Sequence, residues 1–281
     1  MSPNEDPQRL APLYRVVGPR GSWSDWRKTA MLIRHMTRRQ LALRYRGSAL
    51  GFVWSLLNPI LMMVVYTFVF KFVFRLSAPG VPYPVFFLTG LLAWNFIHIA
   101  TMNSGSSVAD NLTLIDKAYF PRYALPLSAV AANLINYVVS LPVLLLFALF
   151  YGVTPQASFL LLPFAVLLLV ALATALGLLT AALTPFFRDL TQLLELLFFA
   201  WFFASPVLYP VSMPQENLDP TVFAFYRLNP VVGVQSLVRG VFLNQTLDLT
   251  AIGISVLVTS VLLVVGWIVF QRNARRFDEA V

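Results

Sequence analysis

A stretch of 65 residues, from Tyr123 to Phe187, contains no Asp, Glu, Lys or Arg. The hydrocarbon core of a bilayer is about 30 Å thick, and a helix needs roughly 20 apolar residues to cross it. The stretch is therefore long enough for two crossings, and the turn-forming residues 151–155 are the expected break between them. This feature predicts a polytopic membrane protein.

Four other windows without charged residues are long enough to hold one span each. They cover residues 47–70, 76–109, 196–215 and 249–271. Together with the two crossings in the long stretch, they predict an all-α polytopic membrane protein with six transmembrane helices. An even number of spans places both termini on the same side of the membrane.

The distribution of basic residues indicates which side that is. If both termini are cytoplasmic, the inner segments hold 16 of the 20 Lys and Arg residues. The outer side then keeps only Lys71, Arg75, Arg227 and Arg239. Cytoplasmic loops are enriched in Lys and Arg, so this orientation is the expected one. The net charge of +8 is thereby explained by a cytoplasmic membrane face, and we expect no nucleic-acid partner.

Residues 24–46 contain too many charges to span a membrane, but their pattern is amphipathic. On a helical wheel the apolar half holds Trp26, Ala30, Leu32, Ile33, Met36, Leu41 and Leu43, and the basic half holds Arg27, Lys28, Arg34, Arg38, Arg39 and Arg46. This pattern predicts an interfacial helix that lies along the cytoplasmic membrane surface. The chain is accordingly divided into a polar N-terminal tail (1–23), this amphipathic helix (24–46) and a six-span transmembrane domain (47–281).

The segment between spans five and six, residues 206–248, has apolar runs too short to cross. Five prolines interrupt it. Two of its apolar runs, residues 222–228 and 231–243, are candidates for short helices that do not cross the membrane. We expect a re-entrant helix pair at the outer end of a pathway, since irregular backbone at membrane depth must be covered by protein or line a wet cavity. Asn229 is the expected N-cap of the second helix, with Pro230 at its first position. An ordinary external loop is the alternative.

Several chemistries are excluded or disfavoured by composition. The chain has no cysteine and only two histidines, His35 and His98, so we expect no metal site. Its lysines do not follow a glycine, so it lacks a phosphate-binding loop for ATP, and no GxSxG or HExxH motif is present. We therefore predict no catalytic residue. Glu195 is the one acidic residue that enters a span, and a structural ion pair near Arg188 and Asp189 is favoured over a proton relay.

Two cytoplasmic loops, residues 111–122 and 184–190, expose aromatic and charged residues together. Such surfaces suggest a protein partner, and a separate ATPase docking there would supply the missing energy source. Tight turns without a partner are the alternative. The candidate contact residues in these loops are Asp116, Lys117, Tyr119, Phe120, Arg122, Arg188 and Asp189.

Aromatic residues make up 14% of the chain and gather in spans one and five. Aromatic rings stack against the C–H faces of sugars, so these side chains are candidates for a glycan path. Lipid-facing belts and helix packing are the alternative. The candidates are Trp54, Tyr66 and Phe70 in span one, and Phe198, Trp201, Phe202 and Tyr209, which share one helical face with Ser205, in span five.

Four stretches of the sequence carry a family resemblance. They are residues 43–59 (LRYRGSALGFVWSLLNP), 90–95 (GLLAWN), 114–121 (LIDKAYFP) with Leu125-Pro126, and 187–190 (FRDL) followed by Ser205-Pro206-Val207. In order and spacing they resemble the type-2 ABC exporter permeases of the polysaccharide and polyol-phosphate export family. The chain is similar to membrane subunits of O-antigen exporters (the Wzm type), with capsule and teichoic acid exporters as relatives.

The resemblance implies a homodimer in the bacterial inner membrane that works with two copies of an ATPase subunit, which would bind ATP and Mg²⁺. It implies that the loop around Lys117 is a coupling helix, and that Arg188 and Asp189 lie in a second cytoplasmic contact. It also implies that the re-entrant pair, with Asn229 and Pro230, forms an outer gate. The implied cargo is a polysaccharide on undecaprenyl pyrophosphate, whose pyrophosphate would meet Arg39, Arg44 or Arg46 at the entrance. Another cargo, such as a drug or lipid, and a membrane glycosyltransferase are the competing hypotheses.

Overall fold

The fold was analysed in a computed structural model, which describes residues 23–45, 53–73, 75, 78, 80–117, 120–154, 156–187, 189–274 and 276–277. Within these ranges the chain forms helices and no strand, apart from one isolated bridge between Ala78 and Val81. The expected tail, Arg46, Tyr119 and Arg188 lie outside the described residues, as do the side chains of Trp54, Phe70, Asp116 and Lys117.

The helices follow one another along the chain with short connections. Their bounds are α2 (Trp23–Tyr45), α3 (Val53–Thr67) with a π-helical extension η1 (Phe68–Val73), α4 (Tyr83–Ala109), α5 (Leu112–Lys117), α6 (Ala124–Phe150), the 3₁₀ turn η2 (Ala157–Leu161), α7 (Leu162–Leu183), α8 (Leu190–Phe203), α9 (Ser212–Asn217), α10 (Pro220–Tyr226), α11 (Pro230–Leu243) and α12 (Leu249–Ala274).

Four of the described helical segments are long and apolar enough to cross a membrane. They are α4, α6, α7 together with η2, and α12. The expected break between the two crossings of the long uncharged stretch is confirmed, because α6 ends at Phe150 and Gly152 adopts a φ of 79°. The helices expected as spans one and five, α3 and α8, are shorter, so the described helices support a polytopic membrane protein with at least four long apolar segments.

The expected bounds of span five are wrong. The structure begins α8 at Leu190 and ends it at Phe203, whereas the uncharged window ran over residues 196–215. At 1.5 Å per residue the 14 residues of α8 extend about 21 Å. Pro206 explains the early end, because proline lacks an N–H and disfavours the helical conformation at Ser205 before it. Ser205 and Tyr209 therefore do not continue the helical face of Phe198 and Phe202.

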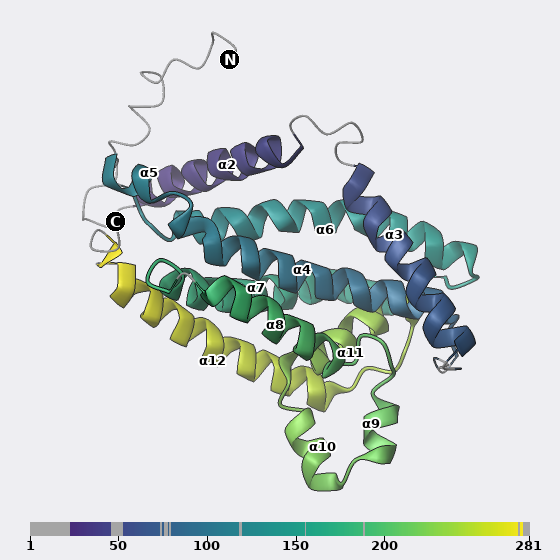
Figure 1. Ribbon diagram of the computed structural model, residues 1–281. Coiled ribbons are helices and arrows are strands. Elements are labelled where there is room, and N and C mark those ends of the chain that lie inside the picture. Colours follow the sequence, from purple (N-terminus) through teal and green to yellow (C-terminus); the bar gives the residue numbers. More distant parts are fainter. Residues whose placement is uncertain are drawn as a thin grey trace.

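The long helices form a bundle with α4 at its centre. Figure 1 shows α4 between α6 and α7, with α12 on the far side of α7 and α2 lying outside α6. Most of α4 is buried. Small residues allow the close approach of α4 and α7, since a Cβ on Gly177 would lie 2.7 Å from the Cβ of Ser104.

One end of the bundle joins the segments expected on the cytoplasmic side. Leu32 of α2, Ile115 of α5 and Phe270 of α12 belong to one buried apolar cluster, which also contains Phe120 and Phe277. Figure 1 shows the start of α2, α5 and the end of α12 at this end. We call this cluster the inner core.

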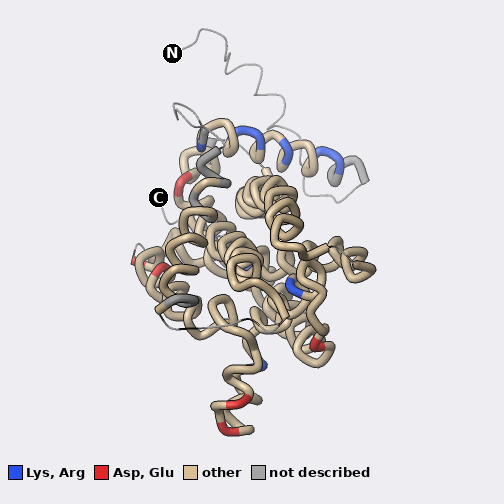
Figure 2. The backbone as a smooth tube through the Cα atoms, turned by 90° about the vertical axis from the view of Figure 1, so that its right-hand side faces the viewer, with Lys and Arg blue, Asp and Glu red and all other residues tan. Residues whose placement is uncertain are grey.

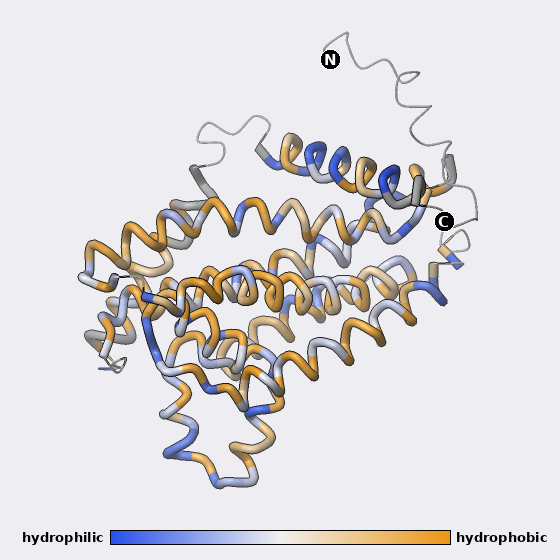
Figure 3. The backbone as a smooth tube through the Cα atoms, turned by 180° about the vertical axis from the view of Figure 1, so that it is seen from behind, coloured by the Kyte–Doolittle hydropathy of each residue, from blue (hydrophilic) through white to orange (hydrophobic). Residues whose placement is uncertain are grey.

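A helix is present where the amphipathic helix was expected, because α2 lies within one residue of the predicted bounds. Its placement on the membrane surface stays a prediction. Leu32 and Met36 are buried, whereas Arg27, Arg34, Arg38 and Arg39 are exposed. Figure 2 shows the basic residues spaced along α2, and Figure 3 shows its hydrophilic character against the hydrophobic bundle. The apolar stripe of α2 packs on protein, mainly on α6.

The segment between α8 and α12, which we expected on the outer side and call the outer segment, divides into two parts. Helices α9 and α10 project from the bundle, as Figure 1 shows, and no described residue of α10 is buried. In contrast, α11 is buried along almost its whole length against α4, α7 and α12. The two short helices expected in this segment are therefore present, but only the second is covered by protein.

Candidate functional site

A polar ladder joins α2 to the bundle beside the expected entrance. Thr37 Oγ1 donates to the carbonyl oxygen of Ser128 at 3.3 Å, and Gln40 Nε2 donates to Ser128 Oγ at 3.1 Å. One step further along both helices, Arg44 Nη1 donates to Asn133 Oδ1 at 2.9 Å. The contacts advance in the same direction on α2 and α6, so the second half of α2 runs alongside α6 on the outside of the bundle.

Arg44 is the candidate entrance residue that the structure connects to the bundle. The Oδ1 atom of Asn133 also accepts from Asn103 Nδ2 on α4 at 3.2 Å, so α2, α4 and α6 meet at one amide. The Arg44 side chain is exposed and has five N–H donors, of which this contact uses one. Arg39 is also exposed on α2, so both guanidinium groups are accessible to an anionic ligand.

Four of the seven aromatic candidates, Tyr66, Phe198, Trp201 and Phe202, gather around Trp94 between α3, α4 and α8. The ring of Trp94 on α4 lies 5.9 Å from Phe198, 5.5 Å from Trp201 and 5.7 Å from Phe202, measured between centroids. Tyr66 of α3 contacts Phe202 at 6.2 Å, edge to face. Phe198 and Phe202 are buried inside the subunit by these contacts. Phe199 and Phe203 of the same helix are exposed, and sequence analysis did not select them.

Asn229 connects this aromatic cluster to the expected outer gate. Its Oδ1 atom accepts from Val231 N at 3.0 Å, which confirms the predicted N-cap, and Pro230 takes the first position of α11. The same oxygen accepts from Trp201 Nε1 at 3.1 Å, and Asn229 Nδ2 donates to Ser205 Oγ at 3.0 Å. One side chain thus holds the end of α8 against the start of α11. Tyr209 donates to the carbonyl of Phe203 at 2.9 Å and closes the turn after α8.

A buried arginine on α11 fixes the same turn from the other side. Arg239 is 3% exposed, its guanidinium carbon lies 3.6 Å from the centre of the Phe86 ring, and its Nη2 donates to the carbonyl of Val207 at 2.9 Å. Among the described residues it has no ion pair with a carboxylate. Burial raises the pKa of its neighbour Tyr226 well above the ordinary range, so that hydroxyl stays neutral. Charged groups buried in membrane proteins are costly and mark functional positions.

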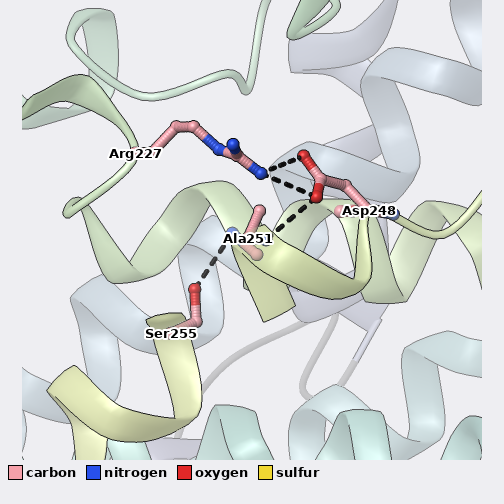
Figure 4. A network of polar contacts seen from close by, with 6 residues as sticks. Arg227, Asp248, Ala251 and Ser255 are labelled. Atoms are coloured by element: carbon pink, nitrogen blue, oxygen red, sulfur yellow. Dashed lines mark hydrogen bonds and ion pairs between the residues drawn. The ribbon is translucent and has the colours of Figure 1, made fainter. Parts of the chain in front are cut away.

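Figure 4 shows a second polar network, at the junction of α10, α11 and α12. Arg227 Nη2 contacts both carboxylate oxygens of Asp248, at 2.8 and 3.0 Å. Asp248 Oδ1 also accepts from Ala251 N at 3.0 Å and caps the first turn of α12. Ser255 Oγ donates to the carbonyl of Pro230 at 2.7 Å. These bonds tie the projecting α10 and the buried α11 to α12.

The expected docking residues divide into buried and exposed ones. Phe120 is 7% exposed and belongs to the inner core, while Arg122 donates to the carbonyl of Ala274 and lies 6.0 Å above the Phe277 ring. Both therefore bind within the chain. Phe187 and Asp189, in the second loop, are exposed. This loop offers an accessible apolar ring next to a carboxylate.

The structure also identifies polar partners that sequence analysis missed. His98 Nε2 of α4 lies 3.3 Å from Glu195 Oε2 of α8, so histidine contacts Glu195 where the expected neighbours were Arg188 and Asp189. Asn103 and Asn133 were also overlooked, because the search of the spans considered charged residues only. Uncharged polar residues inside an apolar span were the signal that could have found them. Among the described residues, no group of three His, Asp or Glu side chains could hold a metal ion.

Comparison with known proteins places this geometry in a family. The sequence profile of the ABC-2 type transporter family matches residues 31–243, from the first half of α2 to the end of α11. The chain belongs to the ABC-2 type transporter family. The matched region of this ABC-2 transporter chain contains the polar ladder, the aromatic cluster, Asn229 and Arg239.

Individual relatives cover nearly the whole chain. This chain is 35% identical to the O-antigen export system permease protein RfbA of Myxococcus xanthus over 251 residues. The aligned region covers 89% of this chain and 95% of the relative. A protein of the same name from Klebsiella pneumoniae is 32% identical over 245 residues, with 87% and 92% covered. The polysialic acid transport protein KpsM of Escherichia coli is 23% identical over 207 residues, with 72% and 77% covered.

Proposed function

We propose that this chain is the permease subunit of an ATP-driven exporter that moves a lipid-linked, O-antigen-like polysaccharide across the bacterial inner membrane. The observation that carries the proposal is the similarity to two O-antigen export permeases at 32% and 35% identity over more than 85% of the chain. The four long apolar helices suit a membrane subunit. Six spans with both termini in the cytoplasm remain part of the proposal.

The energy source in this proposal is a separate ATPase. The sequence has no phosphate-binding loop, so ATP and Mg²⁺ would bind to two copies of a partner subunit. The exposed residues Phe187 and Asp189 support a docking surface in the second loop. In the first loop, helix α5 and the sequence that follows it, with Asp116, Lys117 and Tyr119, would be the coupling element.

The proposed path lies between two copies of the chain, along α3 and α8. Both helices have exposed apolar side chains, which include Met62 and Val65 on α3 and Phe199 and Phe203 on α8. The lipid carrier would be undecaprenyl pyrophosphate, whose phosphates suit the exposed guanidinium groups of Arg39 and Arg44. The outer gate would be the segment from α9 to α11, held by Asn229 and Pro230.

A capsule polysaccharide is the second candidate cargo. The observation that favours it is the 23% identity to the polysialic acid transport protein, over 72% of this chain. This similarity is weaker and shorter than that to the O-antigen permeases, so the O-antigen-like cargo is preferred.

Deletion of this chain, followed by fractionation of lipid-linked glycan, tests the proposed function. We expect full-length glycan on the cytoplasmic face of the inner membrane and none at the cell surface, and re-expression of the chain restores the surface glycan. Its sugar composition then distinguishes O-antigen from capsule. Normal surface glycan in the deletion strain would contradict the proposal.

A further inference from the structure

Two titratable side chains meet between α4 and α8, in helices that otherwise carry no formal charge. Glu195 is the only charged residue of α8, and α4 contains His98 but no Asp, Glu, Lys or Arg. His98 lies 11 residues from Ala109, the nearer end of α4, which is about 16 Å along the helix axis. The pair therefore lies beside the middle of a segment long enough to span the membrane.

The His98 imidazole lies beside the Glu195 carboxylate as a close polar contact without a hydrogen bond, and it leaves most of the carboxylate open. His98 Nε2 lies 3.3 Å from Glu195 Oε2, and the imidazole ring is itself fixed against Phe198, 4.9 Å away between ring centroids. The side chain of His98 is 27% exposed, whereas that of Glu195 is 59% exposed. A carboxylate has about four acceptor sites on its two oxygens, so most of the hydrogen-bonding capacity of Glu195 faces outward.

The open side of Glu195 indicates what covers this part of α8. A carboxylate facing hydrocarbon at this depth is costly, and ionisable groups in spans face a bundle interior or a water-filled cavity. Since Glu195 is more than half exposed in the single chain, its face of α8 is better suited to a polar path than to lipid. Phe199 of the same helix is 64% exposed, so an aromatic ring accompanies the carboxylate.

A carboxylate beside aromatic rings matches the chemistry of a neutral sugar. Sugar hydroxyls donate to the carboxylate oxygens in charge-assisted hydrogen bonds, and the C–H face of the sugar packs on a ring. The same negative charge repels a glycan that carries carboxylates, which provides specificity through an unfavourable contact.

We propose that Glu195, positioned by His98, binds the hydroxyl groups of a neutral glycan as it passes along α8, and that it selects against acidic glycans. The inference rests on the proposed polysaccharide export and adds the sugar class and the residue that recognises it. His98 acts through Glu195 and is a positioning residue.

The first test asks whether Glu195 faces water. The chain contains no cysteine, so the thiol introduced by Glu195→Cys is the only one in it, and its modification reports water access at position 195. In the intact complex with its ATPase subunits, we expect a charged, membrane-impermeant methanethiosulfonate reagent to modify this cysteine. The matched control is Leu257→Cys on α12, a position 66% exposed in the subunit, which we expect to face lipid and remain unmodified. An unreactive cysteine at position 195 would overturn the inference.

The second test measures sugar selectivity directly. The complex in lipid nanodiscs is titrated with a neutral mannose hexasaccharide and with a sialic acid hexasaccharide, and tryptophan fluorescence reports binding, since Trp94 and Trp201 are part of the cluster next to Phe198. We expect the wild type to prefer the mannose oligomer. Glu195→Ala weakens its binding about tenfold, the loss expected for hydrogen bonds to a charged acceptor. Glu195→Gln keeps the size but not the charge, and it binds the acidic oligomer more tightly than the wild type does.

Two further variants complete the design. Glu216→Gln on the projecting α9 removes one negative charge away from the pair and leaves both titrations unchanged. His98→Asn, which keeps a donor near the carboxylate, retains the preference for the neutral oligomer, whereas His98→Ala reduces it. Equal preference in the two His98 variants would overturn the positioning role.

The possible failures are distinguishable from each other. Wild-type titrations in both Glu195→Ala and Glu195→Gln would overturn the sugar-binding role, even if the complex exports glycan. A wild-type complex that binds neither oligomer would also overturn it, while the surface glycan of the deletion strain decides the proposed function separately.

Discussion

At the residue scale, Gly90 shows how one position can be restricted by several neighbours. A Cβ at this position would lie 2.8 Å from Arg239 Nη2, 3.2 Å from Gln235 Oε1 and 3.2 Å from the carbonyl oxygen of Val207. Gln235 Nε2 also donates to the carbonyl of Gly90 at 3.0 Å. The glycine therefore lets α4 approach the two polar side chains of α11 and the turn after α8.

Replacement of Gly90 by alanine tests this packing. We expect Gly90→Ala to lower the free energy of unfolding by about 1–3 kcal/mol, as overpacking of a tight site does, and to displace Arg239. Gly253→Ala on α12 is the matched control, because a Cβ there meets no atom within 4 Å and alanine favours a helix. Thermal unfolding of the purified proteins measures both effects. Equal midpoints for the two variants would contradict the account of Gly90.

Single residues were predictable where the signal is local. The roles of Asn229 and Pro230 at the start of α11 were predicted because an N-cap and the residue after it are defined by their immediate neighbours. The contact between His98 and Glu195 was not predictable, because the two residues lie on different helices far apart in the sequence. The burial of Arg239 was missed for the same reason, since the sequence alone placed it in an external segment.

At the element scale, the outer segment is held to the bundle by bonds between helix ends. Asn229 joins α8 to α11, and the pair of Arg227 with Asp248 joins the end of α10 to the start of α12. Because α10 has no buried residue among those described, its position depends strongly on these polar contacts.

Removal of the Arg227–Asp248 pair should loosen this corner. We expect Arg227→Ala to raise hydrogen–deuterium exchange across residues 220–230, with a cost on the order of 1 kcal/mol for a partly exposed, bidentate pair. The exchange of α4 and α7 amides stays unchanged. Glu216→Gln on α9 serves as the control for a charge lost elsewhere in the projecting segment. Unchanged exchange in residues 220–230 of Arg227→Ala would show that the pair does not hold the corner.

The two loops expected on the cytoplasmic side, residues 111–122 and 184–190, should respond differently to substitution. We expect Asp189→Ala to lower export several-fold while ATP hydrolysis continues and the unfolding temperature is retained, because the side chain is exposed in the proposed docking loop. Phe120→Ala should instead destabilise the chain by about 3 kcal/mol, since the ring belongs to the inner core. Paired measurements of export, ATP hydrolysis and unfolding check this. Wild-type export by Asp189→Ala would remove that residue from the docking surface.

At the scale of the whole molecule, the length of the uncharged apolar runs was the main basis for predicting the membrane-spanning helices. The uncharged windows predicted α4, α6, α7 and α12, because a span needs a long stretch that hydrocarbon can accommodate. The same argument misplaced the ends of α8, because the helix begins before the charged residue Glu195 and stops short of Pro206. The arrangement of α9, α10 and α11 depends on contacts between distant helices, so no local pattern could specify it.

The central claim is that this chain, with an ATPase partner, carries lipid-linked glycan across a bilayer. The most direct measurement reconstitutes the purified complex in proteoliposomes with lipid-linked glycan on the ATPase-accessible face and follows its arrival on the opposite face. The account predicts ATP-dependent transfer, which stops when the ATPase subunits or this chain are omitted. ATP hydrolysis without transfer of glycan would contradict the account and direct the search to a different cargo.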